Sequence, residues 1–146
     1  MSAKDGFETA LLELIFNNEA IADIGDAGGL QPSASAGNLY VALFTVTPSD
    51  SVQGTECDYT GYARVAVART VGGFTVTGDT VSNAAAVTFG QCTAGDTDVA
   101  VAFAFCTSDI EDADDAIIWG TLTANLTIEV GVTPEFTVGS LTVDCN

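Results

Sequence analysis

Hydrophobic and polar residues alternate in short runs along most of the chain. From residue 39 onward, apolar or β-branched runs of four to thirteen residues recur, and Gly, Asp, Asn or Pro separate them. Regular short runs with turn residues between them predict antiparallel strands, so we expect a mainly β fold, an antiparallel β-sandwich of about 7-8 strands with one short N-terminal helix. The predicted strands are LYVALFTV (39–46), YARVAVART (62–70), GFTVT (73–77), TVSN (80–83), AVTFGQC (86–92), VAVAFAFCT (99–107), AIIWGTLTANLTI (116–128) and EFTVGSLTVDC (135–145).

The segment 5–17 has a different period. Its apolar residues recur at helical spacing, and Asp5 followed three residues later by Glu8 matches a capping-box start. The sequence GDAGGLQPSASAG (25–37) is rich in Gly, Ser and Ala, which is typical of a loop. These patterns predict two parts within a single domain: an N-terminal helix and flexible arm at 1–37, and a β-sandwich at 38–146.

One hairpin can be placed in register. Gly78 and Asp79 separate the runs FTVT and TVSN, and a two-residue loop with Gly first is typical of a tight β-hairpin. This turn predicts that Val76 lies opposite Val81 on the paired strand.

Two predicted strands have no polar face. In VAVAFAFCT one face carries Val and Phe, while the other carries three alanines and then Cys106; LYVALFTV is likewise apolar on both sides. Both faces of such strands must be covered, and an alanine face suits the close approach of a helix or of a second subunit. We therefore name as interface candidates the apolar residues of the helix and first strand together with two arginines: Phe7, Leu11, Ile15, Tyr40, Phe44, Arg64 and Arg69.

The charge balance bears on which classes of partner the chain is expected to bind. The chain has 20 Asp and Glu against 3 Lys and Arg, for a net charge of -17. Such a surface repels phosphate and anionic lipid, so we expect neither a nucleic-acid nor a membrane partner. A hydrophobic content of 47% is too high for a disordered acidic chain. No apolar run reaches the roughly 20 residues of a membrane helix, and the acidic N-terminus does not resemble a signal peptide.

Candidate chemistry is sparse. The chain has no histidine, so the commonest general base is absent, and it contains no phosphate-binding or nucleophile motif. We therefore expect no enzymatic activity and no cofactor. The cysteines lack CxxC spacing, which argues against a zinc site. Disulfides and buried free thiols both stay open for Cys57, Cys92, Cys106 and Cys145.

The acidic segment 109–115 is the one metal candidate. It places five carboxylates in seven residues, and Ca²⁺ takes six to eight oxygen ligands. A solvated loop is the favoured interpretation, because no glycine supplies the sharp turn of a calcium loop. The candidate calcium ligands are Asp109, Glu111, Asp112, Asp114 and Asp115.

The two arginines of YARVAVAR have two interpretations. Each of Arg64 and Arg69 pairs with a local carboxylate, or each contacts an acidic partner surface through charge-assisted hydrogen bonds. We favour the first interpretation.

Six segments follow one another in a characteristic order. They are ETALLELIF, NLYVALFTVTPSDS, GTECDYTGYARVAVA, VSNAAAVTF, IIWGTLTANLTI and VTPEFTVGSLTV. In this order the chain resembles a family of bacteriophage virion proteins labelled tail-fibre or head-decoration proteins. The resemblance covers essentially the whole chain and implies a structural role in a tailed-phage particle, with no catalytic residue to transfer. The acidic segment and the cysteines lie outside the pattern.

We expect a capsid decoration (cement) protein on the virion exterior, made in the host cytoplasm. It would form a homo-oligomer, a dimer or trimer, and bind the major capsid protein through interfaces of more than about 1,200 Å². The helix and arm would make such contacts, so a chain without residues 1–24 is expected to fold. The alternatives are a tail-fibre or receptor-binding-associated module, and a calcium-dependent carbohydrate-binding module that uses the acidic segment.

Overall fold

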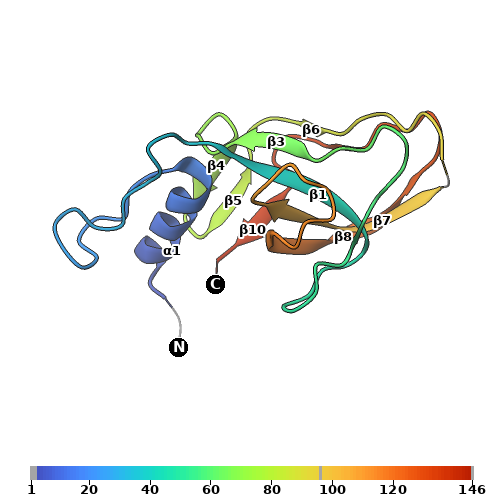
Figure 1. Cartoon of the computed structure of the whole chain (residues 1–146). Coiled ribbons are helices and arrows are strands. Elements are labelled where there is room, and N and C mark those ends of the chain that lie inside the picture. Colours follow the sequence, from blue (N-terminus) through green and yellow to red (C-terminus); the bar gives the residue numbers. More distant parts are fainter. Residues whose placement is uncertain (1–2, 96, 146) are drawn as a thin grey trace. The chain divides into compact units, whose positions relative to one another are not determined.

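The computed structural model describes residues 3–95 and 97–145 (Figure 1). The prediction of a mainly β, antiparallel fold with one short N-terminal helix is confirmed. The antiparallel sheets are consistent with the predicted β-sandwich. Ten strands are assigned in the described residues, and three of them, β2, β6 and β9, are only two residues long. The elements are α1 (Asp5–Leu12), η1 (Glu13–Asn17), β1 (Asn38–Val46), β2 (Thr55–Glu56), β3 (Val65–Ala68), β4 (Phe74–Thr77), β5 (Thr80–Asn83), β6 (Val87–Thr88), β7 (Asp98–Cys106), β8 (Ala116–Ile128), β9 (Glu135–Phe136) and β10 (Thr142–Asp144).

The chain forms two compact units. Unit 1 combines the N-terminal segment with two later ones, and unit 2 comprises the remaining two segments. Among the described residues, no helix is long and apolar enough to cross a membrane. The segments are Met1–Asn38, Ala68–Ala86 and Phe136–Asn146 in unit 1, and Leu39–Val67 and Val87–Glu135 in unit 2.

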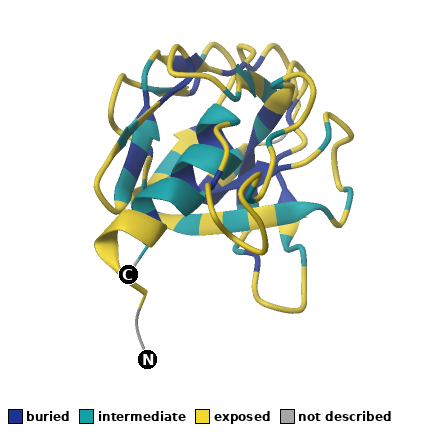
Figure 2. Cartoon of the chain, turned by 90° about the vertical axis from the view of Figure 1, so that its left-hand side faces the viewer, coloured by how far each residue is buried: buried dark blue, intermediate teal, exposed yellow. Residues whose placement is uncertain are grey.

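In unit 1 the helix packs on the β4–β5 hairpin (Figure 1). Phe16 has no exposed surface, and its ring meets that of Phe74 edge-on with centroids 5.0 Å apart. The buried residues of the helix are spaced four apart, so they lie on one side of it; they are Glu8, Leu12 and Phe16. Figure 2 shows the exposed first turn and the progressively buried later turns. The helix therefore belongs to the core of unit 1.

The predicted capping box does not form. The helix begins after Lys4, whose carbonyl oxygen accepts hydrogen bonds from the N–H groups of Phe7 and Glu8, and no side chain caps the first turn. Asp5 is instead the first helical residue, where its negative charge faces the positive end of the helix dipole. The last turn is π-helical and ends at Asn18, which has a left-handed φ of 58°.

The arm that follows the helix is tied to it. Asn18 Nδ2 donates to the Ser33 carbonyl oxygen at 2.9 Å, and the Ser33 N–H donates to Asn18 Oδ1 at 2.9 Å. Ile21 and Leu30 exchange two backbone hydrogen bonds. These bonds join the arm to the end of the helix at Ser33 and close the chain between Ile21 and Leu30, while the predicted flexibility of the arm stays a prediction.

Arg69 holds the C-terminal end of the helix. Its Nε donates to the Ile15 carbonyl oxygen and its Nη2 to that of Leu14, both at 2.6 Å. Its Nη1 reaches Ser33 Oγ and the Ala36 carbonyl oxygen, both at 3.3 Å. A cation at this position satisfies carbonyls that have no partner in the helix and complements the negative end of the dipole. Among the residues that the structure describes, Arg69 pairs with no carboxylate, so the favoured pairing is wrong for Arg69 within that part of the chain.

Replacing Arg69 by Met is expected to lower the free energy of unfolding by about 1.5–3 kcal/mol, the range for hydrogen bonds to charged groups. Arg69→Lys keeps the charge but loses the planar fork, so it is expected to fall between Met and the unsubstituted chain. Urea denaturation followed by circular dichroism measures the difference. Equal stabilities of the three chains would contradict this role.

The predicted hairpin register is confirmed. Val76 pairs with Val81 and Thr77 with Thr80, and Gly78 has a φ of 63°. On the other edge of β5, Asn83 is buried and joins the 137–141 segment to the hairpin. Its Nδ2 donates to the carbonyl oxygen of Thr137 at 2.9 Å, and its Oδ1 accepts from the N–H of Leu141 at 2.9 Å. The Asn of the VSN segment is thus a structural crosslink.

In unit 2 the strands of the larger sheet are ordered β2-β1-β7-β8, and β3 also pairs with β1. Antiparallel register places Ala42 opposite Ala104 and Phe44 opposite Ala102. The alanine face of β7 lies in a cluster with no exposed surface. The prediction that both faces of these strands need cover is confirmed for residues 41–44 and 102–106, whereas Val99 at the start of β7 is 40% exposed; the alanine face is not left open for a second subunit. The cluster consists of Ala42, Phe44, Ala102, Ala104 and Cys106.

Candidate functional site

Arg64 lies at the centre of a buried ion cluster in unit 2. Its Nη2 is 2.5 Å from Glu56 Oε1, and its Nη1 is 2.8 Å from Asp115 Oδ1. The Arg64 side chain has no exposed surface, and those of Glu56 and Asp115 are 2% and 13% exposed. The favoured interpretation, that the arginine pairs with local carboxylates, is confirmed for Arg64.

The same cluster closes the acidic segment at both ends. Arg64 Nη1 donates to the Ser108 carbonyl oxygen at 2.9 Å, near the start of the segment. Asp115 Oδ2, at its end, accepts from the N–H of Ser108 at 2.7 Å and from its hydroxyl at 3.0 Å. These bonds fix the position at which β8 begins.

The two carboxylates of the cluster have pKa values shifted in opposite directions. Burial raises the pKa of Glu56 above its ordinary 4.5, and the hydrogen bond and charge of Arg64 only partly oppose this shift. Partial burial also acts to raise the pKa of Asp115, but the hydrogen bonds from Arg64 and Ser108 outweigh it and bring that pKa below 3.8. The difference follows from burial, because Asp115 retains more contact with solvent than Glu56.

Tyr62 completes the edge of β1 beside this cluster. Its hydroxyl oxygen accepts from the N–H of Leu43, a residue of β1, at 3.0 Å. Its ring stacks on Phe89 with centroids 6.1 Å apart. Burial raises the pKa of Tyr62, so the phenol stays protonated. The glycine before it is required, because Gly61 has a φ of 109° and a Cβ there would lie 2.3 Å from the Gln91 carbonyl oxygen.

The four cysteines are free thiols in the structure. Cys57, Cys92 and Cys106 are buried, and Cys145 is half-buried. Burial raises the pKa of Cys57 and of Cys106 to about 12, so both stay protonated near neutral pH. Of the two open possibilities, disulfides and buried free thiols, the structure shows buried free thiols at Cys57, Cys92 and Cys106, where cysteine packs as a small hydrophobic residue.

The structure does not gather the five carboxylates of the acidic segment. Asp115 turns inward to Arg64, whereas the other four candidate ligands are exposed on the loop. Within residues 3–95 and 97–145, no three His, Cys, Asp or Glu side chains converge on a position that could hold a metal ion.

The interface candidates differ in accessibility. Phe7 is 42% exposed, while Leu11, Ile15 and Tyr40 are half-buried. Phe44 has no exposed surface, so it has no atoms to offer a partner, and the same holds for the side chain of Arg64. Arg69 is engaged by the helix carbonyls. Partner contacts through the helix stay a prediction.

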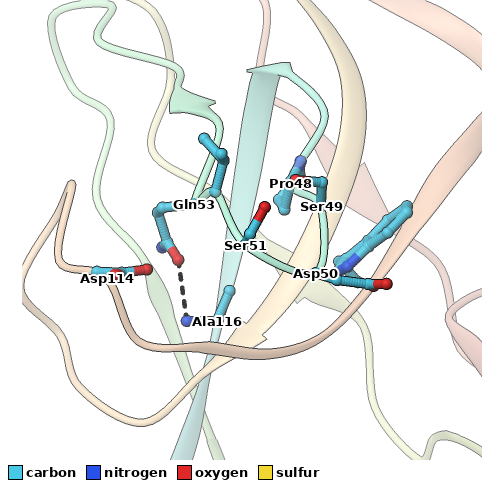
Figure 3. A pocket seen from close by; sticks show the side chains of 9 residues that line it. Pro48, Ser49, Asp50, Ser51, Gln53, Asp114 and Ala116 are labelled. Carbon is cyan, nitrogen blue, oxygen red and sulfur yellow. Dashed lines mark hydrogen bonds between the residues drawn. The ribbon is translucent and has the colours of Figure 1, made fainter.

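Next to the ion cluster, a pocket of about 160 Å³ lies between the β1–β2 loop and the start of β8 (Figure 3). Gln53 Oε1 accepts from the N–H of Ala116 at 3.1 Å and joins the two walls. In the view of Figure 3, Gln53 and Asp114 lie on one side and Asp50 on the other. Sequence reasoning missed this pocket; its signals were the TPSD turn and the single tryptophan. The lining residues are Pro48, Ser49, Asp50, Ser51, Val52, Gln53, Asp114, Ala116 and Trp119.

The six segments of the sequence analysis contribute elements to both units. The model of the family described as podophage GP4 fiber I protein gp80 matches residues 3–144. The chain belongs to this family. No curated protein matches it. Membership in the fiber I family confirms the coarser expectation of a phage virion structural protein; it fits the tail-fibre alternative at least as well and gives the capsid-decoration role no specific support.

Proposed function

We propose that this chain is a structural subunit of a phage fibre and that it assembles with copies of itself. Membership in the fiber I family, over almost the whole chain, supports the first part. The proposal includes no enzymatic activity and no cofactor. One argument for a decoration role was that the alanine face of β7 needs a partner outside the chain. This argument no longer applies, because that face is buried within the chain itself.

The proposal of self-assembly rests on the free edge of β8. This 13-residue strand is last in the order β2-β1-β7-β8, and it contains neither a charged residue nor a proline. An edge strand exposes unpaired N–H and C=O groups that can pair with another chain, and charges or prolines ordinarily prevent this. In the described part of the chain, the other terminal strands of the sheets are four residues long or shorter.

The charge of the protein also favours this strand as the contact. Copies with a net charge of -17 repel one another over most of their surface. Along Ala116–Ile128 no carboxylate of one copy would face a carboxylate of the other. The register with β7 shifts by three residues between Thr121 and Leu126, so the most regular part of the edge is Ile118–Thr121.

Thr121→Glu is expected to weaken self-association by about tenfold or more, because like charges opposite one another destabilise strand pairing. The control is Thr75→Glu, which places the same charge at an exposed position on the four-residue strand β4. Sedimentation velocity over a concentration series measures the association, and circular dichroism verifies folding. A chain that stays monomeric, or equal association of both variants, would refute the role of β8.

Capsid decoration, with binding to the major capsid protein on the shell, is the second candidate function. Gold-labelled antibody on whole particles, combined with gel densitometry, separates the two. Label at the fibres with few copies supports the proposal. Label over the capsid, with copies in proportion to the shell subunits, supports decoration instead.

A further inference from the structure

We propose that this chain requires salt: monovalent ions stabilise its fold, and they control its self-association through β8. The effect on the fold stands on the charges of a single chain. The effect on association rests on the self-assembly proposed above. Three observations support the inference: the positions of the basic side chains, the shortage of ion pairs, and the carboxylates at both ends of β8.

The three basic side chains leave almost no positive charge on the surface. Arg64 has a side chain with no exposed surface and lies between its two carboxylate partners. Arg69 is half-buried, and its donors reach backbone carbonyls and a serine hydroxyl. Of the three, only Lys4 is exposed. The surface therefore lacks the cations that would balance its carboxylates.

Most of the carboxylates consequently have no ion pair. The chain has 20 Asp and Glu, and within residues 3–95 and 97–145 only Glu56 and Asp115 form ion pairs. Unpaired like charges destabilise the compact state, because unfolding moves them apart. The reach of this repulsion depends on salt, since the Debye length is about 30 Å at 0.01 M and about 3 Å at 1 M. We therefore expect salt to stabilise the fold, whereas a fold that relied on surface ion pairs would be weakened.

The same repulsion acts at both ends of β8. The acidic segment precedes the strand, with Asp109 and Glu111 exposed, and the exposed Glu129 follows it directly. Two copies that pair by the same edge are related by a two-fold axis, so their strands run antiparallel. The start of β8 in one copy then lies beside its end in the other, which brings each acidic segment towards Glu129 of the other copy. At low salt these carboxylates oppose the pairing, although the strand itself carries no charge.

The effect requires screening of charge and no ion site. In the part of the chain that the structure describes, no three His, Cys, Asp or Glu side chains converge on a position for a metal ion. Sodium chloride and potassium chloride at equal concentration are therefore expected to act alike. Sulfate is unsuitable as a probe, because it also strengthens the burial of apolar surface.

The test is urea unfolding and sedimentation velocity of the full chain at about 0.01, 0.1 and 1 M sodium chloride, repeated with potassium chloride. Urea carries no charge, so it leaves the ionic strength unchanged. We expect the urea midpoint to rise with salt, and self-association to tighten by about tenfold or more over this range. A midpoint that stays constant or falls would overturn the inference, and so would a response to only one of the two cations.

The two measurements separate this inference from the fibre proposal. A chain that stays monomeric at every salt concentration contradicts the self-assembly proposed above, and the urea midpoint then decides the salt requirement of the fold. A chain that associates equally well at every salt concentration supports self-assembly and overturns its control by salt.

Two matched variants test the repulsion at the ends of β8. Asp109→Asn combined with Glu129→Gln removes two exposed charges that flank the strand. The control, Asp23→Asn combined with Glu19→Gln, removes two exposed charges from the segment after the helix. At about 0.01 M salt we expect the first variant to associate at least about threefold more tightly than the control, and we expect the difference to vanish at about 1 M. Equal association of the two variants at low salt would overturn the role of these flanking carboxylates.

Discussion

Replacing Arg64 by Ala is expected to lower the free energy of unfolding by about 3–5 kcal/mol, the range for breaking a buried ion pair. The loss follows because Glu56 and Asp115 would both keep their buried positions without the cation that lies 2.5 Å and 2.8 Å from them. Chemical denaturation near neutral pH measures it. A variant with the stability of the unsubstituted chain would show that the cluster relaxes into solvent.

The pH dependence gives this prediction a second readout. A raised pKa means that the folded chain binds the Glu56 proton more tightly than the unfolded chain, so protonation of this residue favours folding as the pH falls. The deficit of Arg64→Ala is therefore expected to shrink when the pH is lowered towards 4.5. In the unsubstituted chain the lowered pKa of Asp115 has the opposite effect, and its contribution is lost only as the pH falls below 3.8.

Adding Glu56→Gln to Arg64→Ala provides the matched test. The amide removes one of the two uncompensated charges while it keeps the shape of the side chain. We expect the double variant to be more stable than Arg64→Ala alone at neutral pH, with a weaker dependence on pH. No recovery would mean that the loss arises from packing of the arginine stem and not from charge.

Phe16→Ala is expected to cost about 3–5 kcal/mol, the range for truncating a fully buried aromatic side chain. Phe16 has no exposed surface and meets Phe74 at 5.0 Å, so its removal leaves a cavity between the helix and β4. Phe7→Ala is the control, because Phe7 lies on the same helix and is 42% exposed. Thermal and urea unfolding compare the two, and similar losses would show that the helix is not a specific part of the core.

This packing changes the expectation for a shortened chain. Deletion of residues 1–24 was expected to leave a folded β domain, but it would remove Phe16 from Phe74 and leave Arg69 without its two helix carbonyls. We now expect the deletion to unfold unit 1. Loss of hydrogen-exchange protection in β4 and β5 would report this, and full protection there would contradict it.

Local patterns on the sequence predicted much of the backbone. Turn chemistry at Gly78-Asp79 specified the register of Val76 and Val81, because a two-residue loop leaves one alignment of its flanking strands. The two apolar faces of LYVALFTV predicted a strand covered on both sides, which Leu43 and Phe44 confirm with no exposed surface. Helical spacing located the helix, although it did not identify the face that is buried.

Local sequence patterns do not predict the contacts that define the site. Arg64 meets Glu56 eight residues earlier and Asp115 51 residues later, and in a chain with 20 acidic residues the sequence does not single out either. Arg69 was expected to pair with a carboxylate, but three of its partners are backbone carbonyls, which every residue carries, and the fourth is Ser33 Oγ. Nor does the sequence show that Gln53 reaches Ala116, because their proximity depends on the order of the strands.

The sequence by itself located most of the strands, the hairpin turn, the acidity and the family, although it predicted one strand at 135–145 where the structure has β9 and β10 in different sheets. Periodicity and turn chemistry act over a few residues, and charge and family resemblance are properties of the whole chain, so all of them can be read without a fold. Only the tertiary structure decided that the alanine face is buried, that Arg64 closes the acidic segment, and that Trp119 lines a pocket. These features depend on which distant strands become neighbours, and that order is set by packing of the whole sheet.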